Sequence, residues 1–323
     1  MGLASRLKKL MVIDVADQVS YCNRTVQVGP HVLVVTCATL DSTVPRLRHK
    51  HHGWTLKHGG HTIWKTTESL SSYLVASKVA DRRRVLELGA GMGVCGLIAH
   101  KTGASSVVLT DGDITTLRYI RQNIEANAPV AGEGKTSESK VEADEEREEE
   151  FRPVHARALI WGDKAEVRQL MEVLEMGQFD LVIGSDVIYP ESLKKAEALR
   201  LQDEKTRQFF VTAAAALREG GTLLLAYEIR YDMKEVLAFM EKHATAVGFG
   251  PPHAVRIEDS PERMVLSLVF NGKAGQHEDE FSSSSAAAEK DDSADDTAHG
   301  WKEMVSCMDA MGFGKAKGSP RVW

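Results

Sequence analysis

The chain of 323 residues has few cysteines, only four, and they are widely scattered. This spacing gives no disulfide framework, so we expect reduced thiols inside the cell. No apolar run approaches the roughly 20 residues that a membrane-spanning helix needs, and no signal peptide is recognisable. We therefore expect a cytoplasmic protein, with the nucleus as a second location and no association with a membrane. A monomer is expected as well.

A complete set of metal ligands is also missing. Residues 49–61 contain five histidines, but no cysteine or carboxylate completes a metal site with the usual spacing. A solvent-exposed loop is the favoured interpretation of this stretch, and we expect no bound metal.

The net charge of −6 arises from two acidic segments of −6 each and a remainder of +6. Residues 131–150 hold nine acidic and three basic side chains, and residues 272–300 hold eight and two. Neither segment has an apolar period, so we predict a disordered insertion and a disordered tail. The expected organisation is an N-terminal extension over 1–62, partly strand and partly histidine-rich loop, a domain over 63–271, and a tail over 272–323 with a short terminal helix.

The segment VLELGAGMGVCG, residues 85–96, predicts a strand, a glycine turn and a helix N-terminus, an arrangement that holds nucleotide cofactors. Dinucleotide folds use G-x-G-x-x-G/A, and counting from Gly89 places Val94 at the third small position. Glu87 would repel a pyrophosphate but suits a cationic amine. S-adenosylmethionine carries such an amine, together with a sulfonium and no phosphate.

Asp111 ends the next predicted strand, 22 residues after Gly89. An acidic residue at this distance meets ribose hydroxyls in either cofactor class. Asp111 therefore supports an adenosine ligand without choosing between the two classes.

From residue 85 onward, apolar strands alternate with amphipathic helices until two final strands follow one another directly. This order predicts an α/β fold with a Rossmann-like, doubly wound sheet of seven strands, mostly parallel and ending in an antiparallel hairpin. The predicted strands are 85–88, 105–111, 155–161, 179–189, 220–230, 253–259 and 264–270. A strand is also predicted at 31–37, and a helix at 63–79 that starts through Thr66 or Thr67. Ligands of such sheets bind beyond the carboxyl ends of the strands.

The motifs ELGAGMG, LTDGD, ALIWG and SDVIY occur in this order. With them the chain resembles the seven-β-strand methyltransferases, and more closely the eukaryotic protein-lysine methyltransferases whose members modify calmodulin, the valosin-containing chaperone and an elongation factor. The resemblance covers about residues 60–270. It implies S-adenosylmethionine as cofactor and a protein, not a nucleic acid, as substrate. The residues expected to bind the cofactor are Trp64, Glu87, Gly89, Gly91, Gly93, Asp111, Trp161 and Ser185.

The resemblance places the catalytic residues Asp186 and Tyr189 in the SDVIY motif. A lysine substrate has a pKa of about 10.4 and arrives protonated, so it must lose a proton before it attacks a methyl group. Asp186 is expected to capture the ammonium and orient the neutral amine, and Tyr189 to line the channel. The competing interpretations are a helix N-cap for Asp186 and core packing for Trp64 and Trp161.

Other functions stay open on the sequence. Enzymes that methylate a base amino group typically carry two prolines where this chain has Val187 and Ile188, which argues against a nucleic-acid substrate. The alternatives are a methyltransferase acting on histidine or another nitrogen, and a catalytically silent adaptor. A nucleotide-dependent oxidoreductase is disfavoured by Val94 and Glu87.

Overall fold

The computed structural model describes residues 20–39, 59–128, 153–188, 196–229, 233–256 and 262–272. None of the helices in these ranges is both long and apolar enough to span a bilayer. The acidic segment 131–150 and nearly all of the tail lie outside the described residues.

A seven-stranded sheet forms the centre of the molecule, in the order β5-β4-β3-β6-β7-β9-β8. Its strands are β3 (Arg84–Leu88), β4 (Ser106–Asp111), β5 (Val154–Ala158), β6 (Phe179–Ser185), β7 (Leu217–Glu228), β8 (His253–Arg256) and β9 (Arg263–Val269). Only β9 runs antiparallel to its neighbours β7 and β8, while the other pairs are parallel. This sheet confirms the predicted fold class.

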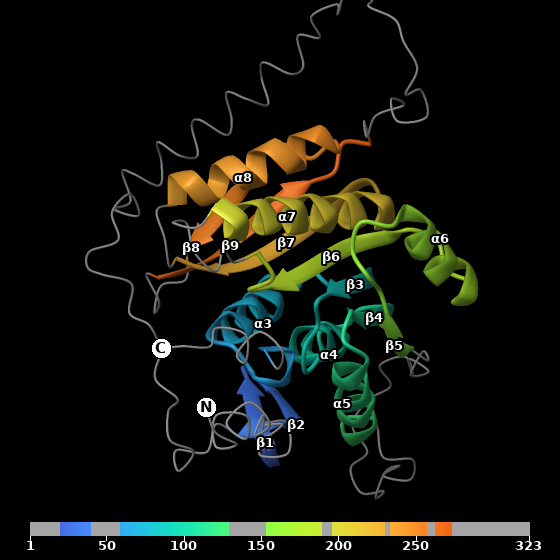
Figure 1. The fold of residues 1–323 in the computed structure, drawn as a ribbon. Coiled ribbons are helices and arrows are strands. Elements are labelled where there is room, and N and C mark those ends of the chain that lie inside the picture. The colour runs from blue at the N-terminus through green and yellow to red at the C-terminus, as the bar shows by residue number, and fades with distance from the viewer. Residues whose placement is uncertain are drawn as a thin grey trace, which may run out of the picture.

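Helices cover both faces of the sheet (Figure 1). One layer holds α6 (Lys164–Val173), α7 (Ala196–Ala216) and α8 (Met233–Ala246), and the other holds α3 (Lys65–Ser77), α4 (Val94–Lys101) and α5 (Ile114–Ala126). Each layer has its own apolar core against the sheet. Because β3 and β4 are covered on both sides, their residues form almost continuous apolar runs rather than an alternating pattern.

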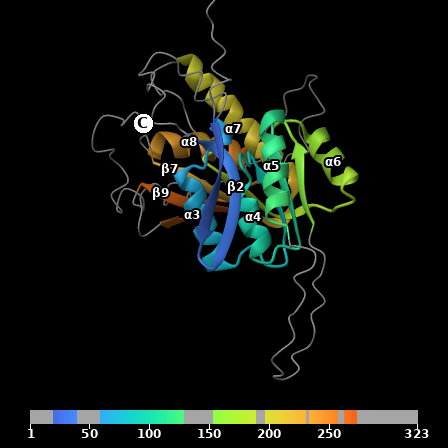
Figure 2. The ribbon, with the colours of Figure 1, turned by 90° about the horizontal axis from the view of Figure 1, so that it is seen from below.

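A two-stranded hairpin, β1 (Ser20–Val28) and β2 (His31–Thr39), lies across the outer side of α3, α4 and α5 (Figure 2). The sequence predicted the second strand and missed the first. Exposed polar residues in the middle of β1, among them Asn23 and Thr25, hide its pattern. Val28, Leu33 and Val35 are buried in the same core as α3, so the hairpin packs as part of the domain.

Several predicted boundaries differ from the structure, among them those of the strand predicted over 220–230, which spans Leu217–Glu228. Three others lie near the carboxyl edge of the sheet. Helix α3 begins at Lys65 with Trp64 at the N-cap, and no side chain caps it, whereas Thr66 or Thr67 was expected to do so. The strands predicted over 155–161 and 179–189 end at Ala158 and Ser185. Trp161 and Asp186 therefore lie beyond the strand ends, in the connections at the carboxyl edge.

Two asparagines, Asn123 in α5 and Asn127 at its C-cap, hydrogen-bond backbone groups of β2 as a neighbouring strand would. Asn123 accepts from the Thr36 amide at 2.7 Å and donates to the Thr36 and Met92 carbonyls. Asn127 accepts from the Val34 amide at 3.0 Å and donates to the Val34 carbonyl. Asn123 is fully buried and Asn127 is half-buried. The hairpin edge is thereby attached to the helix that follows Asp111.

We predict that Asn123→Ala lowers the free energy of unfolding by more than Asn127→Ala, because it leaves the buried Met92 carbonyl and the part-buried backbone groups of Thr36 without partners. Each such group costs about 1 to 3 kcal/mol. Urea unfolding of the two variants measures the difference. If both variants lost the same free energy of unfolding, burial would not determine how much each asparagine stabilises the hairpin.

Candidate functional site

The turn after β3 has a backbone that only glycine adopts without strain. Gly89, Gly91 and Gly93 have φ angles of 68°, 53° and 78°. A Cβ atom added to Gly89 would lie 2.9 Å from Cγ1 of Val187, and one added to Gly91 would lie 2.8 Å from the carbonyl oxygen of Gly60. These glycines therefore provide both the left-handed turn and the close approach of neighbouring segments.

Gly96 shows that the sequence interpretation of Val94, as a residue that breaks the dinucleotide-binding motif, was wrong. Counted from Gly91, the sequence GMGVCG is a complete G-x-G-x-x-G, with Gly96 at the third small position. A Cβ atom on Gly96 would lie 2.0 Å from Cδ2 of Leu109, so the close packing of α4 on the sheet requires glycine there. Val94 is thus no argument against a dinucleotide. The sequence prediction started the motif at Gly89, and therefore did not recognise the motif that starts at Gly91.

Glu87 lies buried beneath the glycine turn. Its Oε2 accepts a hydrogen bond of 2.8 Å from the Gly96 amide in the first turn of α4. The N-cap of that helix, Gly93, offers no side-chain acceptor, so Glu87 supplies one from the strand. Burial raises the pKa of Glu87 to about 8. The hydrogen bond from the Gly96 amide acts to lower this pKa, and the nearby Asp111 carboxylate acts to raise it. The expected contact of Glu87 with a cationic amine stays a prediction.

Asp111 connects the glycine turn to the start of α5. Its Oδ2 accepts from the Gly91 amide and its Oδ1 from the Asp113 amide, both at 3.0 Å. Burial raises the pKa of Asp111, while these amides act in the opposite direction. The side chain is only partly covered, and a carboxylate has about four acceptor positions. It therefore has capacity for ribose hydroxyls as well as for the turn.

Trp161 and Val187 meet the glycine turn from two other strands. The Trp161 ring packs edge-on against Phe209 of α7, with centroids 5.2 Å apart. A Cβ atom on Gly89 would lie 3.2 Å from Cζ2 of Trp161 as well as against Val187. Segments that follow β3, β5 and β6 thus converge at one point of the carboxyl edge. Trp161 is both packed on the core and part of this site.

The first turn of α3 is attached to the same edge. Ser185 at the end of β6 donates its hydroxyl to Oγ1 of Thr66 at 3.0 Å. Arg263 at the start of β9 donates to the Lys65 carbonyl at 2.8 Å. Trp64 precedes this turn and keeps 37% of its surface exposed, so core packing does not account for it. An aromatic ring in this position can form a wall of the site.

Asp186 has the most unusual backbone of the site. It is buried, has a φ of 55°, and donates its amide to the Ala226 carbonyl of β7 at 2.9 Å. A left-handed residue with a side chain costs about 1 to 3 kcal/mol and is often found where function requires it. An N-cap normally has an extended backbone, whereas the backbone of Asp186 is left-handed. The cap interpretation is therefore disfavoured.

Two predicted features cannot be placed. Tyr189 lies outside the described residues, as do four of the five histidines of 49–61. The fifth, His61, is buried rather than part of an exposed loop. No group of three or more histidine, cysteine or acidic side chains suited to a metal occurs within the described part of the chain.

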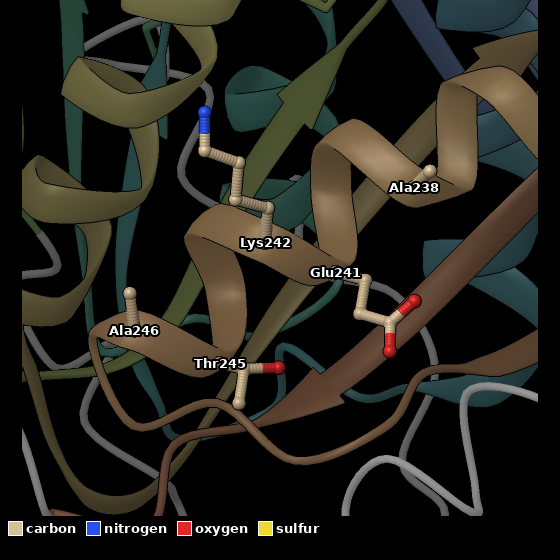
Figure 3. Close-up of a pocket in the computed structure, with 5 residues that line it drawn as sticks. All are labelled: Ala238, Glu241, Lys242, Thr245 and Ala246. Atoms are coloured by element: carbon tan, nitrogen blue, oxygen red, sulfur yellow. The ribbon is translucent and has the colours of Figure 1, made fainter.

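An open depression lies elsewhere, on the solvent side of α8 (Figure 3). Figure 3 shows its lining residues along that one helix. They are Ala238, Glu241, Lys242, Thr245 and Ala246. Since α8 covers the sheet face opposite α4, this depression is separate from the site at the glycine turn.

Comparison with known proteins identifies relatives of this chain. A family model described as lysine methyltransferase matches residues 46–242. Mouse protein N-lysine methyltransferase METTL21A is 29% identical over 205 residues, which cover 62% of this chain and 77% of the mouse protein. Protein N-terminal and lysine N-methyltransferase EFM7 of Cryptococcus neoformans is 32% identical over 154 residues, 47% of this chain and 43% of that protein.

Solved structures of similar fold also exist. An O-methyltransferase from Bacillus cereus in complex with SAH is 13% identical, with a TM-score of 0.40, over 67% of this chain and 86% of that chain.

The raised pKa of Glu87 predicts how stability depends on pH. Between its ordinary value of 4.5 and about 8, the folded state keeps a proton that the unfolded state releases, so wild-type stability falls as pH rises through this window. The slope has a maximum of about 1.4 kcal/mol per pH unit. Glu87→Gln should lose this contribution, so its stability relative to wild type should rise between pH 5 and pH 8.

Urea unfolding at several pH values measures this effect. The matched control is Glu125→Gln on the exposed side of α5, which should follow the wild-type slope. If the free energy of unfolding of Glu87→Gln and of wild type changed with pH in parallel, Glu87 would not hold a proton in the folded state.

Proposed function

Because the chain belongs to the lysine methyltransferase family, whose model matches residues 46–242, we propose that it methylates a lysine side chain of a protein, with S-adenosylmethionine as methyl donor. The family match confirms the resemblance predicted from the ordered motifs. A monomeric state and a cytoplasmic or nuclear location stay predictions from the sequence.

The convergence of three strand ends on Gly89 is the observation that carries the proposal. The glycine turn offers backbone amides at the N-terminus of α4, and Asp111 offers carboxylate oxygens beside it. Trp161 lies against Gly89, where an added Cβ atom would collide with Val187. This close, polar and partly aromatic surface fits an adenosine with a cationic amino-acid tail.

When bound, S-adenosylmethionine supplies an electrophilic methyl group on a sulfonium. The protein's task is to present a neutral amine in line with that methyl group, because orientation supplies much of the rate. Asp186 is fixed at the same edge by its bond to Ala226, so its carboxylate can hold an incoming ammonium. The lysine proton passes to solvent before attack. Tyr189, three residues later, is the proposed wall of the lysine channel.

Two alternatives give different outcomes in the same assays. A histidine acceptor would place the label on imidazole, and a silent adaptor would bind the cofactor without transferring a methyl group. Nothing in the described contacts favours either of them over lysine methylation.

We predict that Asp111→Ala weakens binding of S-adenosylmethionine, because ribose hydroxyls lose a charged acceptor and the Gly91 amide loses its partner. The loss should be about 1.5 to 3 kcal/mol, roughly a 10- to 150-fold higher Kd in calorimetry. The control is Asp203→Ala, which removes a carboxylate bonded to Lys242 and His243 on the other sheet face and should leave the Kd unchanged. Equal affinity of Asp111→Ala and wild type would exclude Asp111 from the site.

We predict that Asp186→Asn lowers the rate of methyl transfer by about 10²- to 10³-fold, because one positioned charge is lost with little change in shape. The Kd for S-adenosylmethionine and the melting temperature should change little. The assay uses the substrate identified by labelling a lysate, with mass spectrometry to locate the methyl group.

Asp163→Asn is the matched control for this substitution. Asp163 caps α6 by accepting from the Ala165 amide, and asparagine caps a helix about equally well. Its activity should stay at the wild-type level. An Asp186→Asn variant that is as active as this control would remove Asp186 from the mechanism.

A further inference from the structure

The histidine-rich stretch ends in a buried histidine whose role the proposed function does not explain. His61 closes a single 3-10 turn, Gly59–His61, and is 2% exposed. Its neighbours come from two distant segments: Tyr21 of β1, and the first turns of α5 that follow Asp111.

The hydrogen bonds around His61 have a defined direction. Thr115 Oγ1 lies 2.8 Å from both carboxylate oxygens of Asp113, so its proton points to that acid. Its lone pairs are then left for His61, whose Nε2 lies 3.4 Å away and must carry a hydrogen. Nε2 is also 3.8 Å from the Asp113 carboxylate. In a neutral imidazole this makes Nδ1 the acceptor of the Tyr21 hydroxyl.

Aromatic packing fixes the same group. Tyr21 stacks on Tyr119 with ring centroids 4.3 Å apart, and His61 meets Tyr119 edge-on at 5.3 Å. Burial raises the pKa of Tyr21 well above its ordinary value, so its hydroxyl keeps the proton that it donates. His61 is thereby held from β1 on one side and from α5 on the other.

The turn that His61 closes rests on the glycine loop. A Cβ atom on Gly91 would lie 2.8 Å from the Gly60 carbonyl oxygen, and one on Gly60 would lie 3.1 Å from Oγ1 of Thr116. The amide of Gly91 is bonded to Asp111. A shift of His61 would therefore move the Gly59–His61 turn, which packs on the glycine loop at Gly91, the residue whose amide is bonded to Asp111.

We propose that His61 is a positioning residue for the cofactor: together with Tyr21 it holds the Gly59–His61 turn against Gly91 and so sets the affinity of the glycine loop for S-adenosylmethionine. The inference rests on the proposed function. It gives the hairpin a role in binding, because β1 supplies one of the two anchors of the turn.

The test is calorimetric binding of S-adenosylmethionine to the full chain. Tyr21→Phe keeps the ring stacked on Tyr119 and removes only the hydroxyl, so the Kd should rise about three- to tenfold. His61→Asn should raise it further. In the double variant the Tyr21 substitution should add little, because its partner is already gone.

Steady-state kinetics separates positioning from general damage. The KM for S-adenosylmethionine should rise as the Kd does, while kcat at saturating cofactor and the KM for the protein substrate stay near wild type. The control is Tyr73→Phe, which changes a partly buried tyrosine of α3 outside this group and should not alter the Kd.

The inference is wrong if folded Tyr21→Phe and His61→Asn bind as tightly as wild type, or if their losses of affinity simply add. A wild-type protein that binds no S-adenosylmethionine would instead contradict the proposed function itself, and this inference with it.

Discussion

The hydrogen bond between the Asp111 carboxylate and the Gly91 amide fixes the glycine turn on which the rest of the site depends. Trp161 and Val187 pack on one side of this turn, at Gly89, and the Gly59–His61 turn packs on the other, at Gly91. These contacts are too close for a side chain at either glycine. The same few residues therefore determine the fold at the carboxyl edge and the shape offered to a cofactor.

Three acidic side chains gather at this edge with different environments. Glu87 is buried at the helix and its pKa is raised to about 8, whereas Asp111 is only partly covered and bonded to two amides. Asp186 lies on a left-handed backbone at the end of β6. Glu87 keeps its proton up to about pH 8, so the negative charge at this edge comes from Asp111 and Asp186, and these two side chains favour a cationic ligand over a pyrophosphate. Val94 no longer counts against a dinucleotide, because Gly96 fills the third small position of the glycine motif. The acidic side chains are therefore the remaining evidence against a pyrophosphate.

The sheet was predictable from the sequence because strands such as β3 and β4 are buried on both faces and form distinct apolar runs. The end of β4 at Asp111 was predictable for the same reason, whereas the binding and catalytic roles of the motif residues stay predictions from the resemblance. What the sequence could not give depends on contacts between distant segments. The Thr66 hydroxyl bonds Ser185 instead of capping α3, and His61 is buried by partners from β1 and α5. Strand β1 was missed because only one of its faces packs on the helices.

The nature of the methyl acceptor is tested most directly by incubating the protein with labelled S-adenosylmethionine and a lysate from cells that lack it. Mass spectrometry then identifies the labelled residue. Lysine methylation in one or a few proteins is the expected result, and the labelling should be strongly reduced when Asp186→Asn replaces wild type. Label on histidine or on RNA, or no label from a protein that binds the cofactor, would contradict a lysine methyltransferase.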